Sequence, residues 1–246
     1  MNARRYLIVN ADDFGQSHGV NRGIIEAHQR GIVSSASLMV RWPAAAEAAS
    51  YGREHPEFSL GLHVDLDEWV FREGAWVRLY EVVPGNDAAA VKEEVQRQLA
   101  AFRRLVRKDP THLDSHQHVH FRQPVQSIAL AMATELGVPL RGCNPDVHYC
   151  GRFYGQTERG SPYPEGISVN GLLTILKDLP PGLTELGCHP GMADDLDTMY
   201  KAEREQEVKV LCDPRVRNAI VAMGIELCSF AISTREAQGS GQRRLA

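Results

Sequence analysis

The chain has 246 residues and is 43% hydrophobic, so it can bury a sizeable core, and we expect one large α/β domain. Its formal net charge of -4 provides no basic field that would gather phosphate groups, which argues against a nucleic-acid partner. No apolar stretch reaches the roughly 18 residues that a membrane span needs, and residues 1–5 are not followed by a signal-peptide core, so we expect a soluble, cytoplasmic protein.

Apolar, β-branched runs alternate with helical patterns along the chain. The apolar runs predict strands at 6–12, 34–40, 59–66, 111–117, 138–143, 183–189 and 225–230. The patterns between them predict helices at 17–30, 43–54, 88–108, 123–136, 168–178, 199–210 and 214–223. Because repeated strand-then-helix units build parallel strands, about seven of them without an obvious linker favour a (β/α) barrel, complete or incomplete, over an open sheet. We assign 1–235 to this domain and expect a flexible tail over 236–246.

Two long stretches lack a clear periodic pattern. They are 67–87, which contains Trp69 and Trp76, and 144–167, which is rich in Gly, Pro and Tyr. Loops of that length are usually functional or disordered, so both are candidate lids or substrate walls. The five cysteines are scattered without a CxxC pair, which suits a reducing compartment rather than a disulfide framework.

Polar residues follow several of the predicted strands where each strand ends. The first strand ends in "DDFGQSHG", which lacks the glycine fingerprint of a dinucleotide site. The carboxyl ends of parallel strands converge on one face, so residues distant in sequence become neighbours there. The residues that we expect at this face are Asp12, Asp13, His63, Asp114, His116, His118, His120 and His189.

Each of these residues also has a purely structural interpretation. Adjacent aspartates after a strand commonly cap a helix, and a single buried histidine such as His63 is more often a hydrogen-bonded core residue. The three alternating histidines of "THLDSHQHVH", at 116, 118 and 120, are harder to explain in that way, because the period of two in a strand would project them towards one side. Buried imidazoles without partners cost free energy, and a divalent metal would accept their lone pairs. Same-face strand residues lie roughly 6.5–7 Å apart, so we expect only one or two ligands from this run.

Four motifs, "LIVNADDFG", "GLHVDL", "THLDSHQHVH" and "CHPG", occur in an order and spacing that resemble the YdjC-like carbohydrate deacetylase family. The resemblance extends over about residues 5–235 and implies a distorted, TIM-barrel-like (β/α) barrel that removes acetyl groups from N-acetylated amino sugars with the help of a metal. It makes Asp13, His63 and His116 the metal ligands. It also implies that Asp12 is the catalytic base and His189 the general acid.

This sequence departs from the family pattern at one position. The family run is often "SHHHVH", whereas Gln117 stands here between two histidines. On a strand Gln117 would face away from its even-numbered neighbours, so we expect the metal site to be intact. Two imidazoles and a carboxylate suit zinc, which we expect as the single divalent cation, although the resemblance points to magnesium.

The remaining site residues are assigned to the substrate or to the surroundings of the metal. Aromatic rings stack on the apolar faces of sugars, so Trp69 and Tyr154 are candidate substrate contacts, unless they only pack the loops onto the barrel. His118, His120 and Asp114 would support the metal ligands or touch the substrate. The expected partner is a small N-acetylated amino sugar, and an exposed apolar barrel helix would be compatible with a homodimer.

Two other functions fit the same residues. A different single-metal hydrolase of amide or ester bonds could use similar ligands, but amidohydrolases usually carry their HxH motif after the first strand, whereas here it follows the fourth. A non-catalytic sugar-binding barrel would be expected to have lost Asp12 or a metal ligand, and none is missing.

Overall fold

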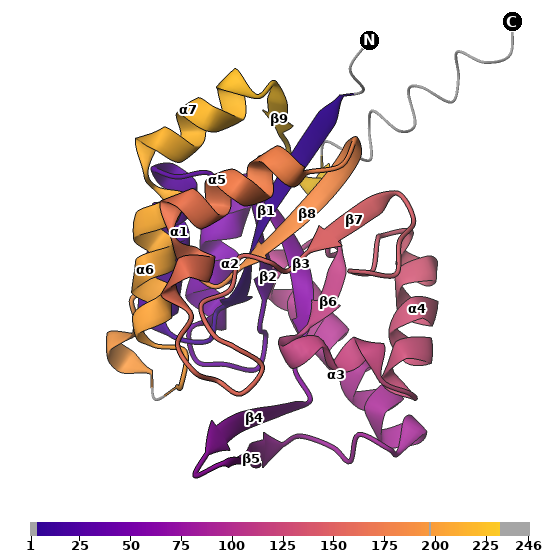
Figure 1. Cartoon of the computed structure of the whole chain (residues 1–246). Helices are drawn as coiled ribbons and strands as arrows, with labels where there is room; N and C mark the ends of the chain where they lie inside the picture. The colour runs from indigo at the N-terminus through magenta and orange to yellow at the C-terminus, as the bar shows by residue number, and fades with distance from the viewer. Residues whose placement is uncertain (1–3, 197, 232–246) are drawn as a thin grey trace, which may run out of the picture.

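Seven parallel strands form the main sheet of the computed structural model, which describes residues 4–196 and 198–231 (Figure 1). Neighbouring strands follow the order β6, β3, β2, β1, β8 and β7, with β9 paired to the amino-terminal half of β1. The strands are β1 (Arg5–Phe14), β2 (Ser35–Leu38), β3 (Ser59–Val64), β6 (Leu113–Ser115), β7 (Val147–Cys150), β8 (Gly182–Cys188) and β9 (Ile225–Leu227). The predicted α/β fold of about seven parallel strands is therefore confirmed.

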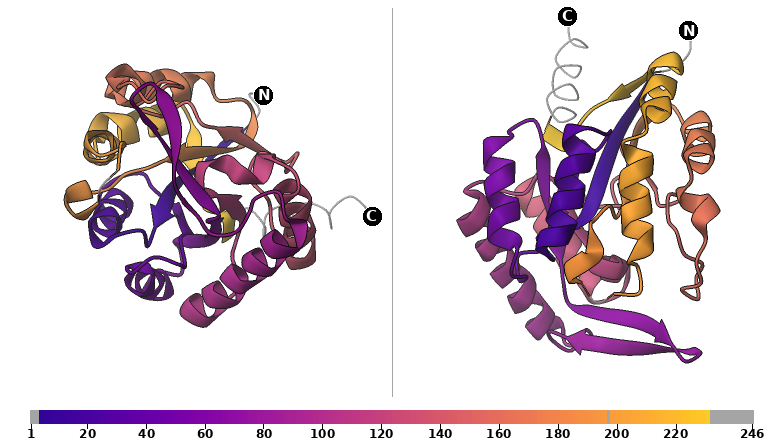
Figure 2. Two further views of the ribbon diagram at one scale, coloured as in Figure 1. Left: turned by 90° about the horizontal axis from the view of Figure 1, so that it is seen from below. Right: turned by 90° about the vertical axis from the view of Figure 1, so that its left-hand side faces the viewer.

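The described residues form seven α-helices around this sheet, and together they have the shape of an incomplete barrel (Figure 2). They are α1 (His18–Gln29), α2 (Ala45–Glu54), α3 (Ala88–Val106), α4 (Val125–Leu136), α5 (Val169–Asp178), α6 (Ala202–Leu211) and α7 (Pro214–Ala222). Each lies within three residues of a helix predicted from sequence. The part of the chain that the structure describes contains no helix that is long and apolar enough to cross a bilayer.

Four of the α-helices named above begin at side-chain caps that the sequence supplies. Ser17, Asp87, Ser168 and Asp213 each accept a hydrogen bond from a backbone N–H in the first turn of α1, α3, α5 and α7, respectively. The core fills the space between the sheet and the helices, and strand β1 runs through it, with Leu7, Ile8 and Val9 completely buried. A strand that is buried on both faces has a continuous apolar sequence, and for this reason β1 could be predicted from the sequence.

The structure corrects three predicted segments. The stretch 67–87 is not irregular, because β4 (Asp67–Arg72) and β5 (Ala75–Glu81) pair as an antiparallel hairpin. Within the predicted strand 138–143 only Leu140 forms a bridge, to Leu113, and the strand lies later, as β7. Strands β6 and β7 are the two edges of the main sheet, and a complete barrel would close between them. The isolated bridge of Leu140 adjoins the β6 edge.

The third correction concerns the predicted strand 111–117. Strand β6 ends at Ser115, and His116–Phe121 form a 3-10 turn in which Gln117 and His118 have left-handed φ values of 48° and 53°. The three histidines therefore do not alternate along a strand. The domain boundary at 235 stays a prediction, and the expected tail 236–246 lies outside the described residues.

Candidate metal centre

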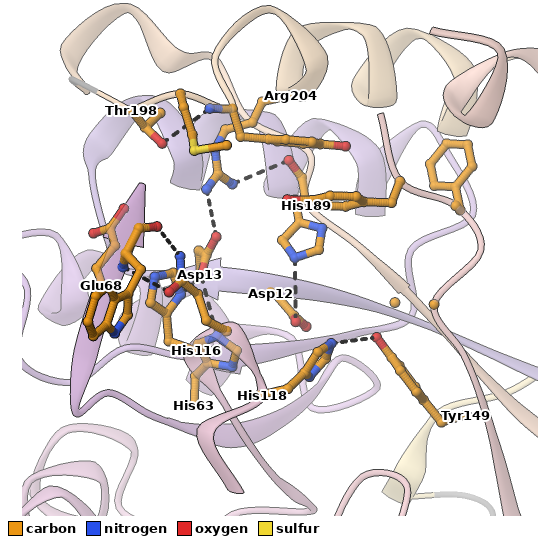
Figure 3. A pocket seen from close by; sticks show the side chains of 18 of the residues that line it. Asp12, Asp13, His63, Glu68, His116, His118, Tyr149, His189, Thr198 and Arg204 are labelled. Carbon is orange, nitrogen blue, oxygen red and sulfur yellow. Dashed lines mark hydrogen bonds and ion pairs between the residues drawn. The ribbon is translucent and has the colours of Figure 1, made fainter. Parts of the chain in front are cut away.

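A cavity of about 660 Å³ opens at the carboxyl ends of the parallel strands (Figure 3). Its floor contains carboxylates and imidazoles from four strand ends, and its walls are largely aromatic. The residues from the strand ends are Asp12, Asp13, His63, His116 and His189, and the aromatic residues are Trp69, Trp76, Tyr149, Phe153, Tyr154 and Tyr200. The cavity thus combines polar groups at its floor with apolar area suited to a small organic ligand.

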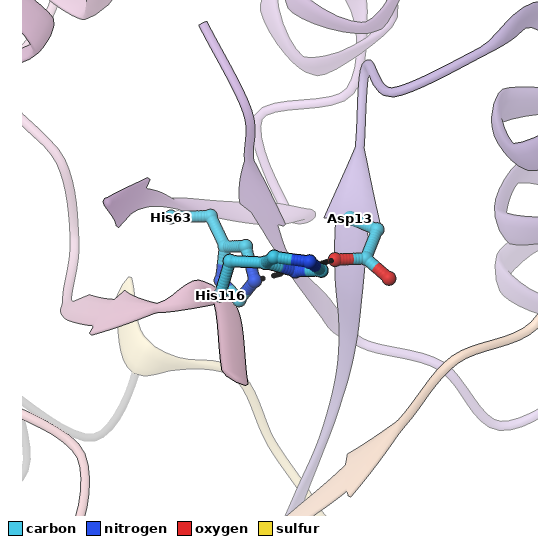
Figure 4. Close-up of side chains that lie close together, drawn as sticks. All are labelled: Asp13, His63 and His116. Atoms are coloured by element: carbon cyan, nitrogen blue, oxygen red, sulfur yellow. Dashed lines mark hydrogen bonds and ion pairs between the residues drawn. The ribbon is translucent and has the colours of Figure 1, made fainter. Parts of the chain in front are cut away.

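Three of the predicted residues converge on one point at the floor (Figure 4). Asp13 Oδ1 lies 3.0 Å from His116 Nδ1 and 3.3 Å from His63 Nε2, although the three residues are far apart in the sequence. All three side chains are at least nine-tenths buried. One ligand atom from each lies within 4.8 Å of the others, which is the arrangement expected of a metal centre.

The two aspartates are adjacent in the chain, yet both reach the cavity. Successive residues of a regular strand point to opposite faces. Strand β1 is irregular here, because its pairing with β2 shifts register between Ala11 and Phe14, and Asp13 has a left-handed φ of 65°. Such an irregularity re-aims side chains, and it turns Asp13 towards the histidines while Asp12 faces Arg141.

Asp12 is held by a buried arginine. Arg141 donates to Asp12 Oδ2 over 2.6 Å and to Oδ1 over 2.7 Å, and Asn10 donates to Oδ1 over 3.0 Å. Burial alone would raise the pKa of Asp12, but the attraction of Arg141 outweighs it and holds the pKa below its usual value. Both lone-pair directions of Oδ1 are therefore used, whereas Oδ2 keeps one free.

The same arginine joins Asp12 to two further carboxylates. Arg141 contacts Asp114 Oδ2 over 2.7 Å and donates to Glu185 over 2.7 Å. Asp114 also accepts from His63 Nδ1 over 2.8 Å, which leaves His63 Nε2 directed at Asp13. This contact fixes the orientation of the imidazole, as carboxylates commonly do behind metal-bound histidines.

His116 reaches the centre because of the turn after β6. Its Nδ1 faces Asp13, and its buried Nε2 has no hydrogen-bond partner among the described residues. Imidazole nitrogens and a carboxylate oxygen that are buried this close together can share a divalent cation, which accepts their lone pairs. Two imidazoles and one carboxylate are also a donor set that zinc accepts. The residues present therefore fit a divalent metal.

A second set of possible ligands fits a metal less well. Asp12, His63 and Asp114 also lie close enough together to share an ion. However, Arg141 already bonds to both carboxylates, and His63 presents to Asp114 the nitrogen that donates to it. The guanidinium thus occupies the position that a cation would take there.

His189 follows β8 and lies beside Asp12. Its Nε2 is 3.7 Å from Asp12 Oδ2, and its backbone N–H donates to Glu207 over 2.5 Å. Burial is the main cause that lowers the pKa of His189 to about 4. In the resting protein at neutral pH, His189 is therefore a neutral imidazole next to an ionised carboxylate.

The other predicted residues fall into two groups. Trp69, Tyr154 and His118 line the cavity, and His118 contacts the Tyr149 hydroxyl over 3.3 Å. Asp114 and His120 are not part of the lining. His120 is fully buried, where it contacts Ser115 Oγ over 2.6 Å and the Arg141 carbonyl over 3.1 Å, so it supports the turn after β6.

Several charged residues of the site were not predicted from the sequence, among them Arg141, Arg204 and Glu207. Arg141 is the only charged residue in the apolar run "GVPLRGC". An arginine in such a run is expected to be buried, and a buried arginine needs carboxylate partners, so this position was the available signal. Arg204 of α6 donates to Asp13 Oδ2 over 2.6 Å, and Glu207 of the same helix accepts from the Tyr200 hydroxyl over 2.5 Å. Helix α6 is so rich in charged residues that nothing in its pattern separates these two from solvated ones.

Comparisons with known proteins agree with this geometry. Residues 6–222 match the sequence model of the YdjC-like protein family. A carbohydrate deacetylase of Geobacillus stearothermophilus is 32% identical, with 92% of this chain and 97% of the relative aligned. A chitooligosaccharide deacetylase of Serratia marcescens is 33% identical over 92% of this chain and 98% of its own length.

A solved structure from Enterococcus faecalis V583 has the same fold. That protein is named for cellobiose-phosphate cleavage, and its superposition has a TM-score of 0.73 at 24% identity. It covers 93% of this chain and 98% of the solved one. At this level of identity the likeness supports the fold of the barrel and not a particular substrate.

Proposed function

This chain belongs to the YdjC-like protein family, and from that premise we propose that it is a metal-dependent deacetylase of N-acetylated amino sugars. The reaction would release acetate from a short oligosaccharide of the chitooligosaccharide type. The observation that carries the proposal is the buried group of Asp13, His63 and His116, next to Asp12 and His189 in one cavity.

Asp13, His63 and His116 would hold the ion. A divalent ion bound there would polarise the acetyl carbonyl and make the attacking water more acidic. Asp114 and Arg204 keep two of these ligands in place, because Asp114 bonds to His63 Nδ1 and Arg204 to Asp13 Oδ2. His63 and Asp13 are thereby each oriented by a hydrogen bond from outside the ligand group.

Asp12 is the proposed general base. Its Oδ2 has one free lone pair, whereas Oδ1 already accepts two hydrogen bonds, so the proton of the attacking water would go to Oδ2. Arg141 stabilises the ionised form and keeps Asp12 ready to accept that proton at neutral pH.

His189 is the proposed acid that protonates the departing amine. With its pKa lowered to about 4, chiefly by burial, the imidazole carries no proton to donate at rest. It therefore has to receive one during turnover, and Asp12 Oδ2 lies 3.7 Å from His189 Nε2. The proton that Asp12 takes from water would pass to His189 and then to the nitrogen as the C–N bond breaks.

The test of the proposed function is acetate release from chito-oligosaccharides. The metal-loaded chain should release acetate from N-acetylglucosamine oligomers, and a chelator should abolish this activity until a divalent ion is added back. Release that persists in excess chelator would contradict a metal-dependent mechanism. Activity on O-acetylated sugars but not on N-acetylated ones would identify the site as that of an ester hydrolase instead.

Three finer proposals accompany this function. We propose that zinc is the ion, because the ligands include two imidazoles, and metal analysis of the protein as isolated tests this. We also propose that the protein acts in the cytoplasm and that it forms a homodimer, as the sequence suggests. Cell fractionation and the mass in solution by light scattering test these two proposals.

A further inference from the structure

The β4–β5 hairpin forms one wall of the cavity. Glu68, Trp69 and Trp76 of the hairpin line the cavity together with the metal-centre residues. The hairpin projects beyond the barrel at the end where the parallel strands finish (Figures 1 and 2). Trp76, close to the tip of the hairpin, is 48% exposed. The exposed indole of Trp76 therefore belongs to the solvent-facing part of this wall.

The hairpin is attached to the barrel at its base. The Tyr80 hydroxyl donates to Asp65 Oδ1 over 2.8 Å, and the Val82 N–H donates to the Leu66 carbonyl over 2.8 Å. Isolated two-stranded hairpins are only marginally stable in water. The position of the distal part therefore depends on further contacts with the barrel.

Gln117 supplies such a contact at Trp69. The Trp69 N–H donates to Gln117 Oε1 over 2.9 Å, and Gln117 Nε2 donates to the Trp69 carbonyl over 2.7 Å. In an antiparallel pair, the N–H and C=O of every second residue face away from the partner strand. The carboxamide of Gln117 thus bonds to the open edge of β4 in the way that a peptide group of a third strand would.

Fixing the backbone of Trp69 also fixes its indole. Within the hairpin, Trp69 Nε1 donates to Asp67 Oδ2 over 3.0 Å, and the Arg78 guanidinium lies 4.7 Å from the centre of the Trp69 ring. These contacts join the side chain to both strands of the hairpin. A shift of the hairpin would therefore carry Trp69 with it.

The turn that carries Gln117 also carries residues directed at two other parts of the cavity. His116 contacts Asp13 at the metal centre, and His118 contacts Tyr149 on another wall. Three successive side chains reach three different surfaces because the backbone is left-handed at Gln117 and His118. A left-handed conformation is unfavourable for residues other than glycine, so the surrounding contacts must hold this turn in place.

We propose that Gln117 is a positioning residue that fixes the β4–β5 hairpin over the metal centre, so that the hairpin reads sugar units beyond the one that is deacetylated. This inference rests on the proposed deacetylase function. Gln117 touches neither the metal ligands nor the reacting amide in this scheme. Its effect is exerted through Trp69 and the wall to which Trp69 belongs.

The test compares substrates of different length in Gln117→Ala. For di- and tri-N-acetylated chito-oligomers, KM should rise about tenfold, equivalent to about 1.4 kcal/mol, while kcat stays within about twofold. For the monosaccharide N-acetylglucosamine, kcat/KM should change by less than about twofold, because the hairpin is not required to bind it. Gln96→Ala, which removes an exposed glutamine from α3, is the matched control and should leave all values unchanged.

The isosteric variant Gln117→Glu separates the contact from general packing. Glutamate keeps an oxygen that accepts from the Trp69 N–H, but its second oxygen cannot donate to the Trp69 carbonyl and repels it. Gln117→Glu should therefore also raise KM for the oligomers. The inference is overturned if either variant keeps the wild-type KM for oligomers, or if kcat falls equally for all substrates with no change in KM.

Hydrogen exchange tests the same contact without turnover. The Trp69 amide should exchange faster in Gln117→Ala than in the wild type or in Gln96→Ala, and unchanged exchange would contradict the role of Gln117. If the wild-type chain releases no acetate from any substrate, the proposed function fails, whereas the exchange experiment still decides whether Gln117 holds the hairpin.

Discussion

The metal centre and the β4–β5 hairpin border the same cavity but are built in opposite ways. The centre consists of buried charged groups whose partners come from β1, β3, α6 and the segment around Arg141. The hairpin is mostly exposed along β5 and has few contacts with the barrel. A network of buried charges allows little variation in position, whereas a peripheral hairpin can change without unfolding the barrel. The difference suggests that the centre determines the chemistry and the hairpin the choice of substrate.

The largest expected effect comes from the centre, in Asp12→Asn. Loss of the general base should lower kcat about 10²–10⁴-fold, while zinc affinity stays within a few-fold, because Asp12 is not among the proposed ligands. Acetate release and calorimetric titration of zinc measure the two quantities separately. Asp178→Asn, on the surface of the barrel, is the control. Retained turnover would remove Asp12 from the role of base and weaken the contrast between the two regions.

A smaller effect is expected behind the ligands, in Asp114→Asn. The substitution removes the carboxylate that orients His63 and also contacts Arg141. Zinc affinity should fall about 10–100-fold, as is usual for partners of metal-bound histidines. Titration of metal-free protein measures the affinity, and Asp146→Asn on an exposed loop is the matched control. Wild-type affinity would show that His63 binds the ion without being oriented by Asp114.

On the hairpin, Trp76→Ala should affect binding and not catalysis. Loss of an exposed indole that lines the cavity should raise KM for chito-oligomers about 2–10-fold, because an aromatic contact contributes about 0.5–1.5 kcal/mol, and kcat should remain unchanged. Val77→Ala is the control, since Val77 is also exposed on β5 but does not line the cavity. A lower kcat at unchanged KM would place Trp76 in the catalytic machinery and remove the proposed division of roles.

The sequence predicts the centre better than it predicts the hairpin, and the reason is physical. The proximity of Asp13, His63 and His116 could be predicted because the carboxyl ends of parallel strands lie on one face of a sheet, and this holds for any order of the strands. The exact path of the chain after β6 could not be predicted, because left-handed residues at Gln117 and His118 have no sequence signal as strong as glycine. Gln117 was expected to face away from its even-numbered neighbours on a strand, and this premise fails because the residues form a turn. The Asp13, His63 and His116 group is nevertheless together.

The hairpin did carry a signal, although a weak one. Its tip has Glu73 and Gly74 with φ values of 52° and 83°, as a two-residue turn with both central residues left-handed requires. Asn-Gly or Asp-Gly would have marked such a turn, whereas Glu-Gly does so only poorly. Arg141 was missed because the segment around it reads as an ordinary apolar strand, and only the structure shows its three carboxylate partners.

The smallest expected effect concerns pH and stability behind the centre. Glu207 is buried, and burial raises its pKa to about 8, although hydrogen bonds from Tyr200 and His189 oppose this. A carboxyl with a raised pKa in the folded protein contributes stability that is fully present below its unfolded value near 4.5 and is lost as the pH rises through about 8. The wild-type Tm should therefore fall between pH 5 and pH 9 by several degrees more than that of Glu207→Gln, at about 2–4 °C per kcal/mol.

Thermal unfolding of the metal-free protein at several pH values measures this difference, with Glu205→Gln, on the exposed side of the same helix, as the control. Parallel Tm curves for wild type and Glu207→Gln would show that Glu207 does not titrate in this range. Because the Trp76 side chain does not titrate, Trp76→Ala should leave the pH dependence of Tm unchanged. A changed dependence in that variant would mean that the two regions are coupled through the cavity rather than independent of each other.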